Sequence, residues 1–142
     1  MNHRQPAVTI VTFALVAPVF MFIIFGTLEM GRVLSAWMVL TNEAREAARY
    51  AAVNYNGTAD PAVELNRQTT NVRSYVQQRL SGVLAPSGMY RQPDVAFVPS
   101  GTNQSPLVQV TLYYQVGLVT PIISQFMPNP FPIAARSAMR GE

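Results

Sequence analysis

The sequence predicts an α+β fold, in which one long N-terminal helix carries a second helix and a small antiparallel sheet of about three strands. Residues 7–28 form an uncharged and almost entirely apolar run. Helical periodicity continues beyond this run as far as residue 53, and an alternation of apolar and polar residues begins at residue 107. Only 12% of the 142 residues are charged, whereas 49% are hydrophobic. Part of the apolar surface is therefore expected to be buried outside a single small core.

The uncharged run, AVTIVTFALVAPVFMFIIFGTL, is long enough to cross a bilayer, because each helical residue rises about 1.5 Å and the hydrocarbon core is about 30 Å thick. A soluble core helix would carry a polar stripe, whereas only Thr9, Thr12 and Thr27 interrupt this run, and their hydroxyls can bond their own helix backbone. A cleaved secretory signal would have a shorter apolar region. We therefore predict a transmembrane helix over residues 7–28, with a short polar extension or leader at 1–6 and an extracytoplasmic domain at 29–142.

The ends and the middle of the span give two further expectations. Arg4 and the α-amino group precede the span, so the positive-inside tendency places the N-terminus in the cytoplasm and the bulk of the chain outside. Pro18 removes one backbone donor and crowds the preceding turn, so the helix is expected to bend or to become non-helical there for about one turn.

The helix is expected to continue past the membrane to residue 53, giving a rod about 70 Å long. One apolar face is predicted from residues at three- and four-residue steps, namely Leu34, Trp37, Met38, Thr41, Ala44, Ala48 and Ala51. The alanines of the last turns either allow another element to approach closely or are present only as good helix formers. Trp37 and Tyr50 are either interface anchors or core aromatics, and a place in the core is expected for both. Glu29 and Arg32, three residues apart, are expected to face each other.

The outer domain is predicted from turn and strand signals. Asp60 and Pro61 mark the N-cap and first residue of a second helix, which runs to about residue 80 with a mildly amphipathic pattern. Strands are predicted at residues 95–98, 107–118 and 133–139, and the second should point Val108, Val110, Leu112 and Tyr114 inward. The proline-rich connection TPIISQFMPNPFP is expected to stay out of the ladder. The helices should then pack on one face of the sheet.

Enzymatic chemistry is not expected. The chain has no cysteine, its single histidine, His3, precedes the span, and there is no glycine-rich phosphate loop. Glu43 and Glu46 are the closest pair of carboxylates, and they are read as a solvated helix face. No cofactor or metal is expected, and the scattered basic residues give no nucleic-acid footprint. Sequons at Asn56 and Asn103 lie in expected turns, where they are open to glycosylation but match a motif of low specificity.

The chain resembles the TadE-like pseudopilins of tight-adherence, type IV pilus-like systems. The resemblance rests on VTFALVAP in the span, on Gly31-Arg32 followed by TNEAREAARY, on a late strand leading to LVTPII, and on a terminal AARSAMRGE, and it extends over nearly the whole chain. It implies a pilin-like fold and a subunit exported through the inner membrane and assembled through its N-terminal helix. The implied roles lie in cell adhesion, motility or secretion.

The sequence departs from the family pattern at the start of the span. The family motif, VEFAL, has glutamate where this chain has Thr12, and the glycine that precedes the prepilin cleavage site is missing, with Ala7-Val8 as the nearest possible processing site. In pilin-like proteins this glutamate neutralises the amino terminus of a neighbour. Its absence predicts that residues 1–7 remain attached, although a short leader ending at Ala7 stays the alternative.

The resulting hypothesis is a structural subunit that forms a helical homopolymer, with further contacts to other pilus or assembly-platform subunits. An all-apolar helix can exchange lipid for sister helices, and a repeated rotation and rise gives an open filament. Candidate charges for assembly are Arg4, Glu29, Arg32 and Glu43. The alternative is a monomeric, membrane-tethered binding or adhesion module. The predicted assembly helix presents Val8, Ile10, Val11, Phe13, Leu15, Val16, Pro18, Phe20, Phe22, Ile23, Ile24, Phe25 and Leu28.

Overall fold

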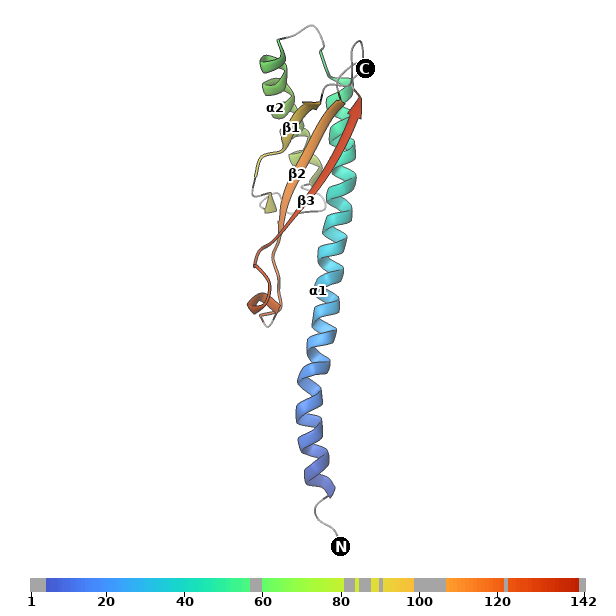
Figure 1. Cartoon of the computed structure of the whole chain (residues 1–142), viewed down its shortest axis with the longest axis vertical. Coiled ribbons are helices and arrows are strands. Elements are labelled where there is room, and N and C mark those ends of the chain that lie inside the picture. Colours follow the sequence, from blue (N-terminus) through green and yellow to red (C-terminus); the bar gives the residue numbers. More distant parts are fainter. Residues whose placement is uncertain are drawn as a thin grey trace.

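A computed structural model describes residues 5–56, 60–80, 84, 88–89, 91–98, 107–121 and 123–140, with side chains described from residue 8 onward. The molecule is a long helical rod, α1, that carries a small domain along its C-terminal half (Figure 1). A second helix and a three-stranded antiparallel sheet make up this domain. The predicted α+β class is therefore confirmed.

Helix α1 (Gln5–Val53) is 49 residues long, which corresponds to about 73 Å at 1.5 Å per residue. Its end agrees with the predicted limit at residue 53. The helix is continuous through Pro18, so the expectation of a non-helical turn there is wrong. A proline removes only one N–H donor, and the regular turns on both sides keep the backbone helical.

Helix α2 (Pro61–Leu80) begins and ends where the sequence predicts. Asp60 is its N-cap, because its side-chain Oδ1 accepts a hydrogen bond from the Ala62 N–H at 2.8 Å. The mildly amphipathic pattern corresponds to one buried face. Val63 is exposed, whereas Glu64 and Gln68 are buried at the start of an i, i+4 stripe that continues through Val72, Val76 and Leu80.

The sheet has the order β1-β2-β3, with β1 (Asp94–Val98), β2 (Leu107–Val116) and β3 (Phe131–Arg140). The predicted alternation along β2 is confirmed, because alternate residues from Val108 to Val116 are buried. Strand β3 begins two residues earlier than expected. Phe131 and Pro132 pair with Val116 and Gln115, so the prediction that they stay out of the ladder is wrong. As an edge strand, β3 tolerates a proline.

Both helices pack on the buried face of the sheet, and α1 also contacts α2. The alanines predicted to permit close approach, Ala44, Ala47, Ala48, Ala51 and Ala52, are all buried. They lie in one core cluster with Val72 and Val76 of α2 and with Val108, Val110 and Leu112 of β2. Small side chains at this point let the helix axis lie close to the sheet, so the close-approach reading explains their presence better than helix propensity alone.

The expected apolar face of α1 above the span is wrong in part. Ala36, Leu40 and Ala44 face the core, whereas Leu34, Trp37 and Met38 are exposed. Trp37 is therefore not a core aromatic. Tyr50 is partly buried and stacks on Tyr75 of α2, with ring centroids 4.5 Å apart. The sequence carries two apolar stripes on this segment, and periodicity alone could not say which one the sheet covers.

Candidate membrane and assembly surface

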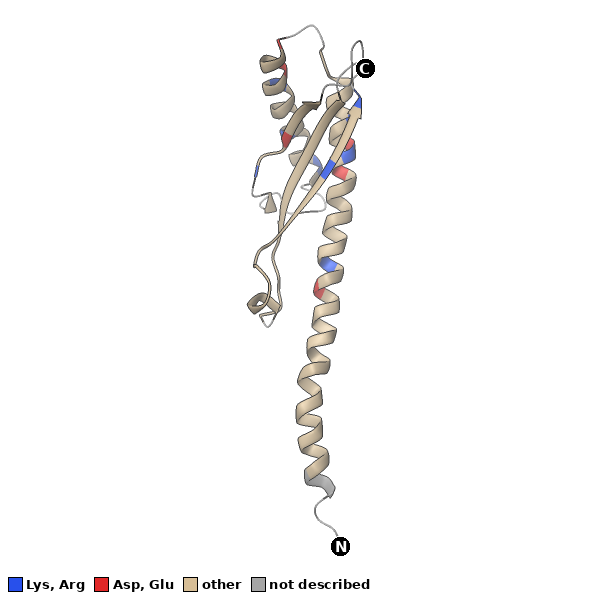
Figure 2. Cartoon of the chain, viewed as in Figure 1, with Lys and Arg blue, Asp and Glu red and all other residues tan. Residues whose placement is uncertain are grey.

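The N-terminal half of α1 presents an uninterrupted apolar surface. All thirteen residues assigned to the assembly helix are exposed in the single chain, and Phe13 and Leu15 are each more than 70% exposed. Figure 2 shows no charge on the described part of α1 before Glu29. The helix is long and apolar enough to cross a membrane, and none of its most apolar window is buried within the structure. A core helix of a soluble protein would be mostly buried, so this surface requires lipid or another chain.

The threonines within the apolar run have their hydroxyls satisfied by their own helix. Thr12 Oγ1 donates to the Val8 carbonyl at 2.9 Å, and Thr27 Oγ1 donates to the Ile23 carbonyl at 2.8 Å. Both bonds follow the expected i, i−4 pattern. Thr12, at the position of the family glutamate, therefore brings no unsatisfied polar group into an apolar environment.

A second exposed apolar stripe lies on α1 above the predicted span. It consists of Met30, Leu34, Trp37 and Met38, each at least 45% exposed. Their spacing of four, three and one residues places them on one side of the helix, adjacent to the side that faces the sheet. We call these four residues the upper stripe. A lipid bilayer cannot cover them if the span ends at Leu28, so their apolar surface lies outside the membrane-spanning part.

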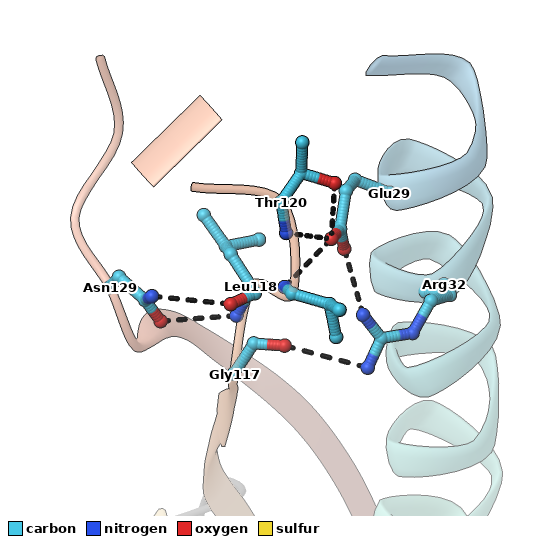
Figure 3. Close-up of polar contacts among 7 residues, drawn as sticks. Glu29, Arg32, Gly117, Leu118, Thr120 and Asn129 are labelled. Carbon is cyan, nitrogen blue, oxygen red and sulfur yellow. Dashed lines mark hydrogen bonds and ion pairs between the residues drawn. The ribbon is translucent and has the colours of Figure 1, made fainter. Parts of the chain in front are cut away.

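Glu29 lies at the boundary between the apolar half of α1 and the domain, and it holds the segment after β2 against the helix (Figure 3). Its Oε1 accepts hydrogen bonds from the backbone N–H groups of Val119 at 2.7 Å and Thr120 at 2.8 Å, and from the Thr120 hydroxyl at 3.1 Å. Its Oε2 accepts from Arg32 Nη1 at 2.8 Å, as the i, i+3 spacing predicted. Arg32 Nη2 also donates to the Gly117 carbonyl at 3.4 Å.

The Glu29 carboxylate is 95% buried by area, yet the site favours its charged form. Burial alone would raise the pKa of this carboxyl. The N–H groups of Thr120 and Val119, the Thr120 hydroxyl and the Arg32 charge outweigh that effect, so the pKa is lowered from its usual value. Glu29 therefore acts as an ionised clamp between two segments that lie 90 residues apart in sequence.

The segment held by Glu29 connects β2 to β3, and we call residues 117–130 the β2–β3 loop. It contains a short 3₁₀ turn, η2 (Ile123–Gln125), and Asn129 closes its base through hydrogen bonds to the backbone of Leu118 at 3.0 and 3.2 Å. The loop extends along α1 toward the N-terminal half (Figure 1). Phe126 meets Phe22 of the apolar run edge-on, with ring centroids 6.1 Å apart. An apolar cavity of about 200 Å³ separates loop and helix near Gly26.

The four assembly-charge candidates have different positions. Arg4 lies outside the described residues. Glu29 and Arg32 bond each other, and Glu43 accepts from Arg79 Nε of α2 at 2.8 Å. The Glu43 side chain is only 14% exposed, so its reading as a solvated carboxylate is wrong. A cation from a neighbouring subunit would have to replace or share an existing partner at Glu29 or Glu43.

A second buried carboxylate, Glu64, joins the two helices. It accepts hydrogen bonds from the Asn56 N–H at 3.0 Å, from Gln68 Nε2 at 2.8 Å and from both Nε and Nη2 of Arg67. Arg67 and Gln68 also donate to the Asn54 carbonyl just after α1. Sequence reasoning missed the Glu64 site, and at Glu29 it predicted the pair with Arg32 but not the hydrogen bonds from Val119 and Thr120. The only signal in the sequence was an acidic residue at helical spacing with apolar residues that are buried in the fold.

The remaining predicted sites are placed as follows. Ala7 and Val8, the possible processing site, both lie within α1, and Val8 is exposed. The described backbone includes Asn56, whereas Asn103 lies outside the described residues. Among the described residues, no group of three or more histidine, aspartate or glutamate side chains could hold a metal ion.

Comparison with known proteins gives one match. No significant match is found to a curated protein or to a solved structure. Residues 7–49 match the family model described as TadE-like protein. The match contains the span, the Gly31-Arg32 pair and most of the TNEAREAARY motif, but it covers less than a third of the chain, whereas the resemblance was expected to extend over nearly all of it. Over residues 7–49, which include the exposed apolar half of α1, this chain is thus similar to TadE-like proteins, as its sequence predicted, and the similarity indicates a pilus-related, membrane-anchored protein.

Proposed function

We propose that this chain is a structural subunit, a pilin or pseudopilin, of a tight-adherence or type IV pilus-like filament. Before assembly it lies in the inner membrane with its N-terminus inside, and assembly moves it into an extracellular polymer of identical subunits. Other pilus or assembly-platform subunits are its further partners. Its role is mechanical, and the apolar packing surface along α1 supports this role.

The upper stripe carries this proposal. Lipid accounts for the exposed surface of residues 8–28, so that surface alone is equally consistent with a monomeric anchor. Met30, Leu34, Trp37 and Met38 extend the apolar surface by about two more turns outside the span. A sister helix packed along α1 would cover both parts at once, because helix pairs bury continuous stripes with three- and four-residue spacing.

Retention of residues 1–7 belongs to the same proposal. The features that a prepilin peptidase reads are absent at Ala7 and Thr12, so the mature chain keeps its first residues. Arg4 and the amino terminus then need water or an acidic partner inside the filament, because an unpaired buried charge is too costly. Glu29 and Glu43 of a neighbouring subunit are the proposed partners, each sharing its carboxylate with the cation that it already binds. N-terminal sequencing of assembled protein that begins at Val8 would contradict retention.

The test compares filaments from cells that make the natural chain, a Trp37→Ser variant and a Val63→Ser control. Both residues are exposed apolar side chains on helices of the same domain, but Val63 lies on α2, away from the upper stripe. Electron microscopy of sheared material should show filaments for the natural chain and the control, and few or none for Trp37→Ser. Membrane fractions should contain equal amounts of all three proteins.

Two outcomes would contradict the proposal. Normal filaments from Trp37→Ser would exclude the upper stripe as an assembly contact. A monomer in sedimentation runs of the natural chain in mild detergent, together with an absence of filaments containing it, would favour the alternative of a membrane-tethered binding module.

A further inference from the structure

The β2–β3 loop lies at the level of the membrane-spanning run and not above it. Phe126 contacts Phe22, which precedes Leu28 by six residues, or about 9 Å along the helix axis. Glu29, just beyond Leu28, holds the start of the loop against α1 by accepting hydrogen bonds from Val119 and Thr120. The loop is therefore held beside the last turns of the apolar run by two contacts on α1, one at Phe22 and one at Glu29.

The composition and exposure of the loop are unusual for a surface connection in water. Residues 117–130, GLVTPIISQFMPNP, contain no charged side chain. Val119 and Phe126 are 73% and 76% exposed, and Met127 is also exposed. Loops that face water are normally polar, and a cluster of exposed apolar side chains marks an interaction surface.

The length of the span identifies lipid as the partner of this surface. If Phe22 and the adjoining loop lay in water, only residues 8–21 of the described apolar run would remain for the bilayer. Fourteen residues rise about 21 Å, which is too short for a hydrocarbon core of about 30 Å. A full span up to Leu28 places Phe22, and with it Phe126, below the membrane surface.

We propose that the β2–β3 loop is a second membrane contact, with Val119, Phe126 and Met127 inserted into the outer leaflet of the bilayer. The insertion is shallow, at the boundary between headgroups and acyl chains, where amphipathic segments bury their apolar side chains by about 5–10 Å. Glu29 and Arg32 are the first charges above the apolar run of α1 and lie at the headgroup level (Figure 2). This inference rests on the membrane anchoring in the proposed function.

The absence of cysteine from the chain allows a direct test with single labels. Full-length Phe126→Cys, Val119→Cys, Ile24→Cys and Val63→Cys variants are labelled with the environment-sensitive fluorophore NBD. They are reconstituted at low protein density into vesicles of phosphatidylcholine and phosphatidylglycerol. Quenching is measured with aqueous iodide and with lipids that carry a nitroxide near the carbonyl end or near the methyl end of the acyl chain.

The label at Ile24 reports the span, and the label at Val63 reports the water-exposed domain. We expect labels at Phe126 and Val119 to emit at shorter wavelength than the label at Val63, to be quenched most strongly by the nitroxide near the carbonyl end, and to resist iodide. The Val119 label matters because Phe126→Cys removes the ring contact with Phe22, whereas Val119→Cys keeps that contact.

The experiment distinguishes failure of the loop proposal from failure of the membrane anchor. If the Ile24 label is quenched by lipid while both loop labels respond to iodide like the Val63 label, the loop proposal is overturned and the anchor stands. If the Ile24 label also responds only to iodide, the membrane anchor and the proposed function fail together. Protection of the loop labels that appears only at high protein density would assign the loop surface to a second copy of the chain and would likewise overturn contact with lipid.

Discussion

Two buried carboxylates, Glu29 and Glu64, hold distant segments of the chain against the helices. Each is almost completely buried and accepts from an arginine three residues further along the same helix. Glu29 also accepts from the backbone N–H groups of Val119 and Thr120, and Glu64 from the Asn56 N–H and the Gln68 amide. Charge-assisted hydrogen bonds of this kind are about twice as strong as neutral ones. Protonating or removing either carboxylate is therefore expected to destabilise the fold, and the first two predictions test this.

The first prediction concerns acid. Burial raises the pKa of Glu64, but the bonds from Gln68, Arg67 and Asn56 outweigh it, so the pKa of the folded state lies below the usual value of 4.5. A carboxyl with a lowered folded pKa contributes stability that is complete above its unfolded pKa and is lost as the pH falls through the folded pKa. The melting temperature, followed by circular dichroism in detergent, should hold steady near neutral pH and fall below about pH 4.5. Glu64→Gln should weaken this dependence, and an equally steep decline in that variant would contradict the assignment.

The second prediction concerns the clamp. Glu29→Ala removes the charged acceptor of two partly buried hydrogen bonds, from the N–H groups of Val119 and Thr120, and a hydrogen bond to a charged group contributes about 1.5–3 kcal/mol. Amide hydrogen exchange at these two residues should accelerate by about one to two orders of magnitude, while exchange in the middle of β2 changes little. Glu46→Ala, a carboxylate removal elsewhere on α1, serves as the control. Equal exchange rates in the two variants would show that Glu29 does not hold the loop.

At the scale of the elements, the close approach of α1 to the sheet depends on the small side chains in the last turns of this helix. Ala44, Ala47, Ala48 and Ala51 are fully buried in the core cluster, and every buried residue of α1 from Ala44 onward is an alanine. Protein interiors are packed as densely as organic crystals, so an added side chain at this point has no space to enter.

The third prediction follows from this packing. Ala48→Leu should destabilise the domain by about 1–3 kcal/mol, because overpacking forces the helix and sheet apart. Chemical denaturation followed by circular dichroism measures the change. Ala62→Leu, an exposed alanine on α2, should change the free energy of unfolding by less than about 0.5 kcal/mol. If both variants unfold alike, the alanines are present only as helix formers.

The C-terminal ends of both helices and the existence of the three strands could be predicted from the sequence because their signals are local, whereas β2 ends two residues earlier than expected and β3 is longer at both ends. Helix α2 follows from Asp60 and Pro61, and β2 follows from alternation with period two. The choice between the two apolar stripes of α1 could not be predicted, since Trp37 and Leu40 are equally consistent with helical periodicity. The partners of Glu29 also could not be predicted. They lie about 90 residues away, and only the tertiary fold brings Val119 and Thr120 to the carboxylate.

At the scale of the whole molecule, charge and apolar surface are separated along one long axis. The domain and the upper half of α1 hold the charged side chains of the described residues, and the lower half of α1 holds none (Figure 2). Such a molecule cannot expose its whole surface to water at low cost, because every residue of the lower half adds apolar area. The exposed surface from Val8 to Leu28 therefore needs an apolar environment, and in the proposed assembly sister helices replace lipid as that environment.

The fourth prediction tests this exchange. Phe20→Arg places a charge near the middle of the apolar run, where it costs a few kcal/mol whether the neighbour is lipid or a sister helix. Filaments should disappear from sheared material, and less protein should be found in the membrane. Phe20→Leu keeps the surface apolar and should leave both quantities unchanged. Normal filaments from Phe20→Arg would rule out this surface as the assembly contact.

The unbroken course of α1 also fixes the direction in which the domain faces. A continuous helix transmits rotation as well as distance, and Phe22 of α1 contacts Phe126 of the β2–β3 loop. One residue inserted into α1 before Phe22 would rotate the entire domain by about 100° about the helix axis, relative to the start of α1, and move it by about 1.5 Å along that axis. An insertion of seven residues would turn it through about 700°, nearly two full revolutions, and restore almost the original heading. In the proposed filament, the number of residues that precede Phe22 in α1 thus sets the angle about the helix axis at which Trp37 faces a neighbouring subunit. This angle does not depend on the chemistry of those residues.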